Sequence, residues 1–208
     1  MGFSVTIILI VINVAASLYA WNRPDIFQRW LLNPYAVRHR NQYYRFITSG
    51  FIHSDYMHLL FNMFTLYFFG PIIEYFYGSL FNGSGTLLFL VLYFAGMILA
   101  DIPTFLKNRN NPNYNSLGAS GAVSAVVFSS IMFQPLNQIY IFGLLPLPGF
   151  VLGGLYLLYS YYQGKRMADN INHDAHLYGA LFGIVFTIAI WPGIIPHFIQ
   201  ELSNFTIF

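Results

Sequence analysis

The sequence predicts an all-α integral membrane protein with six transmembrane helices and a long first loop at the membrane interface. Only 8% of its residues are Asp, Glu, Lys or Arg, against about 25% in a typical soluble domain, and 57% are hydrophobic. A spanning helix needs about 20 mainly apolar residues, and six runs approach this length. They cover residues 3–21, 57–77, 86–105, 117–133, 139–162 and 175–196. We therefore interpret residues 1–208 as a single membrane domain.

The N-terminal part of the chain combines one helix with a long aromatic loop. Residues 3–21 lack the basic start of a signal peptide and stay apolar up to Trp21, so we expect this helix to be retained. The polar interval 22–55 contains aromatic side chains suited to the headgroup level of a bilayer: Trp30, Tyr35, Tyr43 and Tyr44. We therefore expect this interval to lie in the interface.

The later predicted helices are separated by short polar connections. Residues 78–85 are rich in Gly and Ser, residues 107–115 are rich in Asn, and residues 134–138 and 163–174 are also polar. All nine Lys and Arg residues lie in the first, third and fifth connections. The positive-inside rule would place these connections in the cytoplasm and both termini outside.

Polar residues inside predicted spans are costly and suggest function. His58 and Asn62 are four residues apart, so both side chains lie on one helix face. Taken alone, such a pair more often forms ordinary hydrogen bonds between packed helices. Glu74, near the end of the same helix, suits an interfacial or loop-capping carboxylate. The chain has no cysteine, which excludes disulfides and thiol nucleophiles.

Small residues predict a close contact between the fourth and sixth helices. His176, Gly179 and Gly183 share one face of the sixth helix, and the glycines let a neighbouring backbone approach. The fourth helix begins with a matching stripe of small residues at Ser120, Ser124 and Ala125. This contact would bring Ser120 close to His176.

These positions together describe a site for acyl transfer. A neutral imidazole at His176 can accept the hydroxyl proton of Ser120 during attack on a carbonyl. Gly118 and the glycine after the serine permit a backbone path that exposes the serine oxygen and turns amides toward a reacting oxygen. Side-chain donors for the oxyanion are available at His58 and Asn62. The competing interpretation is that the small-residue stripe serves helix packing alone.

Five short motifs occur in an order and spacing that resembles the rhomboid intramembrane serine proteases. They are YYRF (43–46), HSDYMHLLFNMF (53–64), GPIIEYFYGS (70–79), GASGAV (118–123) and AHLYGALFG (175–183). The resemblance covers nearly the whole chain and fits a six-helix rhomboid-like bundle of the bacterial type.

The resemblance implies a role for each matching residue. Ser120 would be the nucleophile and His176 the general base, and the Ser120 N–H would form the oxyanion site with His58 and Asn62. Phe61 matches a position near the family's substrate gate. His173, three residues before His176, is an alternative base. Structural roles would fall to Arg45, Glu74, Gly118, Gly179 and Gly183.

The resemblance also implies a substrate class and a location. Rhomboids cleave single-span membrane proteins within or near the transmembrane segment, in a water-containing cavity open to the non-cytoplasmic face. Both termini would be cytoplasmic, opposite to the bias of the basic residues, and we favour the family orientation because the first loop is long and interfacial. We expect a multi-pass protein of the bacterial inner (cell) membrane, in contact with the lipid bilayer. We expect no cofactor, no metal and no nucleic-acid partner.

Other classes of protein compete with this interpretation. A catalytically inactive rhomboid-like protein would bind membrane clients, but the chain keeps both Ser120 and His176. A haem or metal protein could use His53, His58, His173 and His176, but the chain has no H-E-x-x-H motif. A transporter would show internal inverted repeats, which we do not find.

Overall fold

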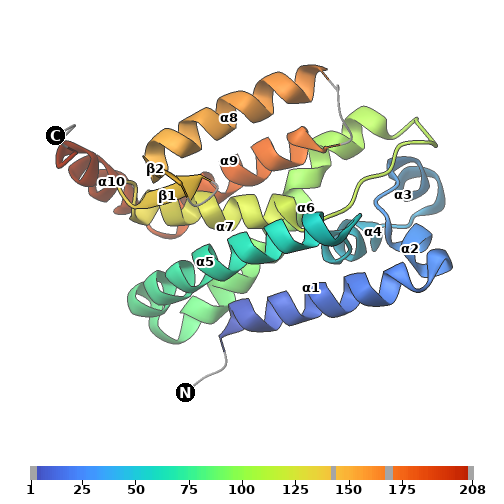
Figure 1. Ribbon diagram of the computed structural model, residues 1–208, viewed down its shortest axis with the longest axis horizontal. Coiled ribbons are helices and arrows are strands. Elements are labelled where there is room, and N and C mark those ends of the chain that lie inside the picture. Colours follow the sequence, from blue (N-terminus) through green and yellow to red (C-terminus); the bar gives the residue numbers. More distant parts are fainter. Residues whose placement is uncertain (1–3, 142–143, 167–170, 206–208) are drawn as a thin grey trace.

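The computed structural model describes residues 4–141, 144–166 and 171–205, and most of them are helical (Figure 1). In chain order the elements are α1 (Val5–Trp21), α2 (Pro24–Trp30), α3 (Pro34–Arg40), α4 (Arg45–Thr48), η1 (Ser49–Phe51), α5 (Tyr56–Phe81), η2 (Asn82–Ser84), α6 (Gly85–Asn108), α7 (Ser120–Phe133), β1 (Gln138–Ile141), β2 (Leu145–Pro148), α8 (Gly149–Arg166), α9 (His173–Ile190) and α10 (Ile194–Ser203).

The predicted spans agree with the long helices of the structure, except in the last third of the chain. The predicted span 139–162 is wrong at its start, because this region forms the antiparallel hairpin β1–β2, in which Gln138 pairs with Pro148. Pro146 and Pro148 lack the backbone N–H that a helix needs, so α8 begins only at Gly149. The predicted span 175–196 ends early at Ile190, and α10 is a separate helix after Pro192.

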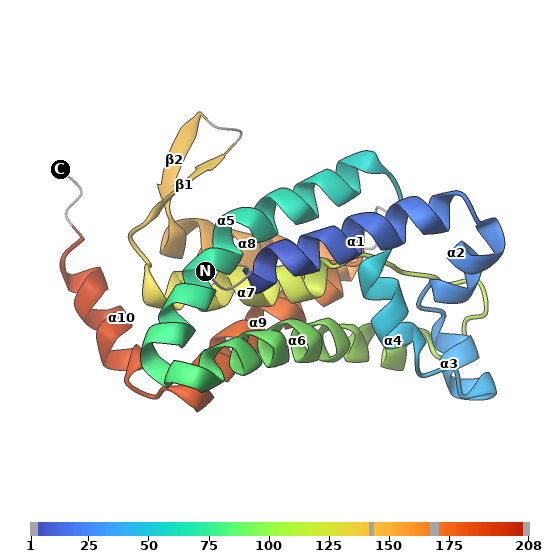
Figure 2. The ribbon, with the colours of Figure 1, turned by 90° about the horizontal axis from the view of Figure 1, so that it is seen from below.

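The interval 22–55, which the sequence predicts to be a loop at the membrane interface, contains several short helices. Both α2 and α3 begin with proline, whose fixed φ suits the first helical position. Asn33 caps α3, because its side chain accepts a hydrogen bond from the Ala36 amide at 2.7 Å. The interval gathers at one end of the bundle, whereas the hairpin and α10 lie at the other (Figures 1 and 2).

The helix α7 lies in the middle of the bundle, between α5 on one side and α9 on the other (Figure 1). It also contacts α6, α8 and α10, and nearly all of its residues are buried. A helix surrounded in this way is apolar or small on every face, which explains why its sequence shows no amphipathic pattern. The N-terminus of α7, where Ser120 lies, is at the end of the bundle that holds α2, α3 and α4.

The contact between α7 and α9 depends on two glycines of α9. A Cβ atom on Gly179 would lie 2.3 Å from the carbonyl oxygen of Gly121, and one on Gly183 would lie 2.2 Å from that of Ala125. Both distances are far below van der Waals contact, so only glycine permits this approach. The predicted contact between the fourth and sixth helices is therefore confirmed.

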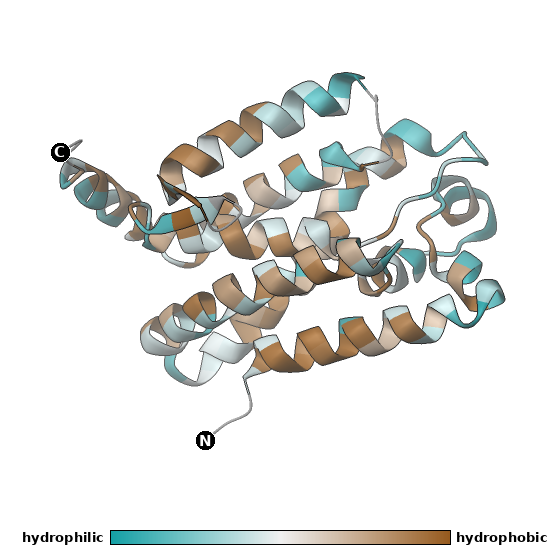
Figure 3. Ribbon diagram, viewed as in Figure 1, coloured by the Kyte–Doolittle hydropathy of each residue, from teal (hydrophilic) through white to brown (hydrophobic). Residues whose placement is uncertain are grey.

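Apolar residues are concentrated in the long helices. Two helical stretches of the described residues, Tyr56–Asn108 and His173–Ile190, are long and apolar enough to cross a membrane. The first of them turns back at η2 and so contains both α5 and α6. The helices Val5–Trp21 and Ser120–Phe133 are apolar but shorter. Apolar residues dominate α1, whereas polar residues gather around α2 and α3 (Figure 3). Because only two described stretches meet the length and hydropathy needed for a span, the six predicted spans stay a prediction.

A polar cluster connects the core helices at the end opposite Ser120. Thr187 donates from Oγ1 to the Gly183 carbonyl at 2.7 Å and lies 2.7 Å from Ser129 Oγ. The Tyr77 hydroxyl is 3.0 Å from the same Ser129 oxygen. The cluster satisfies buried hydroxyls of α5, α7 and α9 together.

We expect Gly183→Ala to destabilise the bundle, because the new methyl group would collide with backbone atoms of α7 that cannot rotate away. Overpacking of this kind costs about 1–3 kcal/mol. The matched control is Gly154→Ala in α8, where a Cβ meets no atom within 4 Å. Thermal unfolding of the purified protein in detergent should show a lower midpoint for Gly183→Ala only. Equal midpoints for the two variants would contradict the close contact.

Candidate active site

The backbone leading to Ser120 is held by the folded interval 22–55. Ser116 and Leu32 exchange two backbone hydrogen bonds, of 2.9 and 3.0 Å, which form an isolated antiparallel bridge. Two residues later, the Gly118 amide donates to the Ser49 carbonyl at 2.9 Å. The start of α7 is therefore fixed by backbone groups, which do not depend on side-chain rotamers.

A buried histidine completes this attachment. Nε2 of His53 accepts a hydrogen bond from the Ala119 amide at 3.5 Å, so the proton of the neutral ring lies on Nδ1. Nδ1 is 3.0 Å from Ser17 Oγ, which donates to the Phe51 carbonyl at 3.2 Å. Burial, and then the nearby His58, lower the pKa of His53 to about 3. The ring thus stays neutral and joins α1 to the start of α7.

His58 lies directly against the turn that precedes Ser120. Gly118 has a φ of 116°, which side chains rarely tolerate, and a Cβ on it would be 2.7 Å from His58 Nε2. Nδ1 of His58 is 3.1 Å from Ser54 Oγ, so the Nε2 side of the ring faces the turn. Asn62 is buried one turn further along α5, and its amide donates to the His58 carbonyl at 2.9 Å. The structure brings His58 to the start of α7 but gives Asn62 a partner within its own helix.

Ser120 and His176 lie at the same end of two touching helices. Ser120 is the first residue of α7, and His176 lies in the first turn of α9. Their chain neighbours are in contact, since a Cβ on Gly121 would be 3.6 Å from the Ala175 carbonyl oxygen. The contact of Gly179 with Gly121 fixes the same register one turn on. The predicted neighbourhood of the two residues is compatible with this packing.

Tyr156 of α8 is a site residue that the sequence did not single out. Its ring stacks on that of His176, with centroids 6.1 Å apart and planes inclined by 18°. Its hydroxyl is 3.0 Å from Ser124 Oγ. Ser124 thus contacts α8 through its hydroxyl, while the backbone carbonyls of Gly121 and Ala125 lie against the glycines of α9. The tyrosines of α8 are too numerous for sequence alone to choose one.

His173 begins α9 and is only 4% exposed. Its ring packs edge-on against Tyr159 at 5.5 Å and against His176 at 5.8 Å. Among the described residues no group of three or more His, Cys, Asp or Glu could hold a metal ion. The four histidines of the metal hypothesis instead form two pairs, because His53 and His58 have ring centroids 5.0 Å apart.

Arg45 holds the interval 22–55 in shape. Its guanidinium donates to the Leu31 carbonyl at 2.6 Å, the Gln28 carbonyl at 3.0 Å and the Gln42 side chain at 2.7 Å. Burial lowers the pKa of Arg45 below its ordinary value. Because Leu31 precedes the residue that pairs with Ser116, the arginine supports the bridge at the start of α7.

Glu74 lies at the start of α1, and Phe61 lies on the exposed surface of α5. The Glu74 carboxylate accepts from the Ser4 hydroxyl at 2.8 Å and from the amides of Val5 and Thr6 at 3.0 and 2.7 Å. It thus caps the first turn of α1, where a negative charge also suits the helix dipole. Phe61 is 56% exposed on the surface of α5.

A cavity of about 10 Å³, enough for one water molecule, lies beside Ser120. Its polar lining comes from Asp101, Ser116, Ser120 and Asn172. Asp101 is another residue that sequence reasoning missed. The available signal was a carboxylate inside the predicted span 86–105.

A family model described as the rhomboid domain matches residues 40–193, which is most of the chain. The chain therefore belongs to the rhomboid family, and the resemblance indicated by the five motifs is confirmed.

Curated relatives carry names of the same family. The chain is similar to RHOMBOID-like protein 12, mitochondrial, of Arabidopsis thaliana, at 28% identity over 74% of this chain and 49% of the relative. Rhomboid-like protein 11, chloroplastic, of the same plant is 31% identical over 69% of this chain and 51% of its own length. Putative rhomboid protease YdcA of Bacillus subtilis (strain 168) is 27% identical, over 70% and 66%.

Two facts about these relatives concern the length and the location of the chain. The chain spans about half the length of the two plant proteins. The names of those proteins place them in mitochondria and chloroplasts, so the relatives do not support the predicted bacterial inner membrane over another membrane.

The pKa of His53 predicts a loss of stability in acid. The unfolded chain takes up a proton near pH 6.5, whereas folded His53 does so only near pH 3. His53 therefore contributes stability above pH 6.5 that is lost progressively as the pH falls toward 3. The thermal midpoint of the wild type in detergent should fall from pH 7 to pH 5, and the fall should be smaller in His53→Gln. An equal or larger fall in the variant would contradict a neutral, buried His53.

Proposed function

We propose that the protein is a serine-type intramembrane endopeptidase that uses Ser120 and His176 as a catalytic dyad. The observation that carries the proposal is the close contact of the start of α7 with the start of α9, seen where Gly121 meets Ala175 and Gly179. Membership of the rhomboid family and the similarity to a putative rhomboid protease support the same chemistry.

In the proposed reaction, Ser120 Oγ attacks a peptide carbonyl while His176 takes the hydroxyl proton. His176 then gives this proton to the departing amine, which leaves an acyl ester on the serine. Water attacks the ester with His176 again as the base, releasing the acid and restoring the serine. Tyr156, stacked on the imidazole, would keep the ring plane fixed through both transfers.

The oxyanion of each intermediate would be stabilised from two directions. The amide of Ser120 lies at the N-terminus of α7, where unpaired N–H groups and the helix dipole favour negative charge. His58 lies on the other side of the turn, with Nε2 toward Gly118. Asn62 would join as a second side-chain donor after its amide exchanges the His58 carbonyl for the substrate.

Membership of the rhomboid family and the position of the candidate site among apolar helices support a substrate class. We propose single-span membrane proteins, embedded in the same bilayer as a six-span, multi-pass enzyme with both termini cytoplasmic. A scissile bond must leave the helical hydrogen-bond ladder before Ser120 can reach it, so small or helix-weakening residues near the cut favour cleavage. An inactive client-binding protein is the alternative outcome of the test below.

We expect Ser120→Ala to abolish cleavage of a model single-span substrate, because no other group replaces the nucleophile. The matched control is Ser130→Ala on the same helix, whose buried hydroxyl donates to the Val127 carbonyl at 2.8 Å. Cleavage by purified, detergent-solubilised protein should survive in the control. Equal cleavage by wild type and Ser120→Ala would refute a serine protease, and no cleavage by folded wild type across several substrates would favour client binding.

A second pair of variants tests the assignment of the base. We expect His176→Ala to remove nearly all cleavage, while His173→Ala keeps most of it, because the His173 ring packs against Tyr159. Both rates should be compared at equal folded fraction, measured by thermal unfolding. A loss in His173→Ala as severe as in His176→Ala would mean that the base is misassigned.

A further inference from the structure

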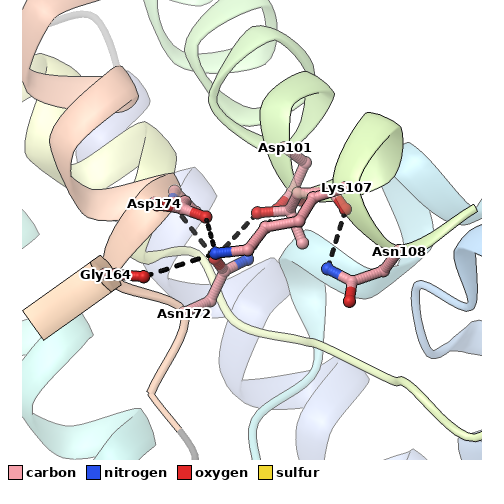
Figure 4. A network of polar contacts seen from close by, with 8 residues as sticks. Asp101, Lys107, Asn108, Gly164, Asn172 and Asp174 are labelled. Atoms are coloured by element: carbon pink, nitrogen blue, oxygen red, sulfur yellow. Dashed lines mark hydrogen bonds and ion pairs between the residues drawn. The ribbon is translucent and has the colours of Figure 1, made fainter. Parts of the chain in front are cut away.

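Asp101 lies in α6 at the level of Ser120 and has no role in the proposed reaction. It lines the small cavity beside Ser120 together with Asn172. A carboxylate among apolar helices is costly unless it is hydrogen-bonded, so its partner indicates what it does. That partner is Asn172, whose Nδ2 donates to Asp101 Oδ1 at 3.1 Å (Figure 4).

Asn172 is the N-cap residue of α9, directly before His173. Its Oδ1 accepts from the Ala175 amide at 3.1 Å, which caps the helix, and from the Thr104 hydroxyl at 2.8 Å. The Ala175 N–H can only donate, so it requires an oxygen and fixes which end of the Asn172 side-chain amide points to it. The NH₂ group must therefore face Asp101, which supplies the acceptor.

The backbone of the same asparagine is hydrogen-bonded to the backbone of His176, the proposed base. The His176 amide donates to the Asn172 carbonyl at 3.3 Å. His176 thus lies on the turn whose start is set by the Asn172 side chain, and a shift of the cap would shift the imidazole relative to Ser120. Misplacement of a reacting group by about 1 Å can cost about 100-fold in rate.

A second contact between α6 and α9 lies further from the cavity. Lys107 Nζ is 3.3 Å from the Asp174 carboxylate in the first turn of α9, and it donates to the Gly164 carbonyl of α8 at 3.3 Å (Figure 4). This ion pair is partly exposed and adds little by itself. The inner contact through Asp101 is therefore the one suited to fix the turn.

We propose that Asp101 is a positioning residue: it orients the Asn172 side chain, which caps α9 and so places His176 against Ser120. This role rests on the proposed serine chemistry. It requires a hydrogen-bond donor matched to an acceptor between positions 101 and 172, as in the bond from Asn172 Nδ2 to Asp101 Oδ1.

An exchange of the two residues tests this pairing. Aspartate caps helices as well as asparagine does, so Asn172→Asp keeps the cap acceptor but turns a carboxylate toward Asp101. Adding Asp101→Asn restores a donor and an acceptor, with their positions reversed. The control is Thr187→Val, which removes a buried hydroxyl of the same helix at the opposite end.

The readout is the rate at which a fluorophosphonate probe labels Ser120 in the purified full chain. We expect Asn172→Asp to label about 10- to 100-fold more slowly than wild type. The double variant should regain most of the wild-type rate, and Thr187→Val should keep its rate at equal folded fraction. A wild-type rate in Asn172→Asp, or a folded double variant as slow as the single one, would overturn the proposal.

Amide hydrogen exchange supplies a readout that does not need activity. Exchange at Ala175 and His176 should be faster in Asn172→Asp and slow again in the double variant. If wild type shows no labelling that depends on Ser120, the proposed protease function fails, and exchange still decides whether Asp101 holds the turn. Unchanged exchange of the Ala175 and His176 amides in folded Asn172→Asp would contradict the proposal that Asp101 fixes the first turn of α9.

Discussion

The structure depends on the absence of two Cβ atoms. Gly179 and Gly183 let the carbonyls of α7 lie against the backbone of α9, and this contact sets the distance and register of the two helices. In a bilayer the hydrophobic effect gives little force between helices, so close backbone packing and hydrogen bonds hold the bundle together. The position of the site at the end of α7 is a direct result of that register.

Around this contact, the approach to Ser120 is built mainly from backbone groups. The bridge between Ser116 and Leu32, and the bond from Gly118 to Ser49, tie the turn to the folded interval 22–55. Arg45 in turn ties that interval together through backbone carbonyls. Arg45 thus supports the segment that leads to Ser120 through backbone groups of the interval 22–55.

The sequence predicted the parts of the site that periodicity determines. Small residues at helical spacing on both helices correctly predicted the contact of α7 with α9, and the family motifs identified the rhomboid domain. The sequence did not predict the hairpin. The apolar residues around Pro146 and Pro148 favoured a spanning helix, although proline disrupts a helix interior. Tyr156 and the partner of Asp101 were missed for another reason: each meets its partner through tertiary packing, and Asn172 lies 71 residues from Asp101.

The cap on α1 has a consequence for the order of assembly. Its first amides are satisfied by Glu74, and the bond from Ser4 to this carboxylate spans 70 residues. During synthesis α1 is made before Glu74. Until Glu74 is in place, the first backbone amides of α1 lack this carboxylate as their acceptor. The helix can enter a membrane early, but its start becomes fixed only when α5 arrives beside it. The helix α1 is thus made before α5 but completed only after it.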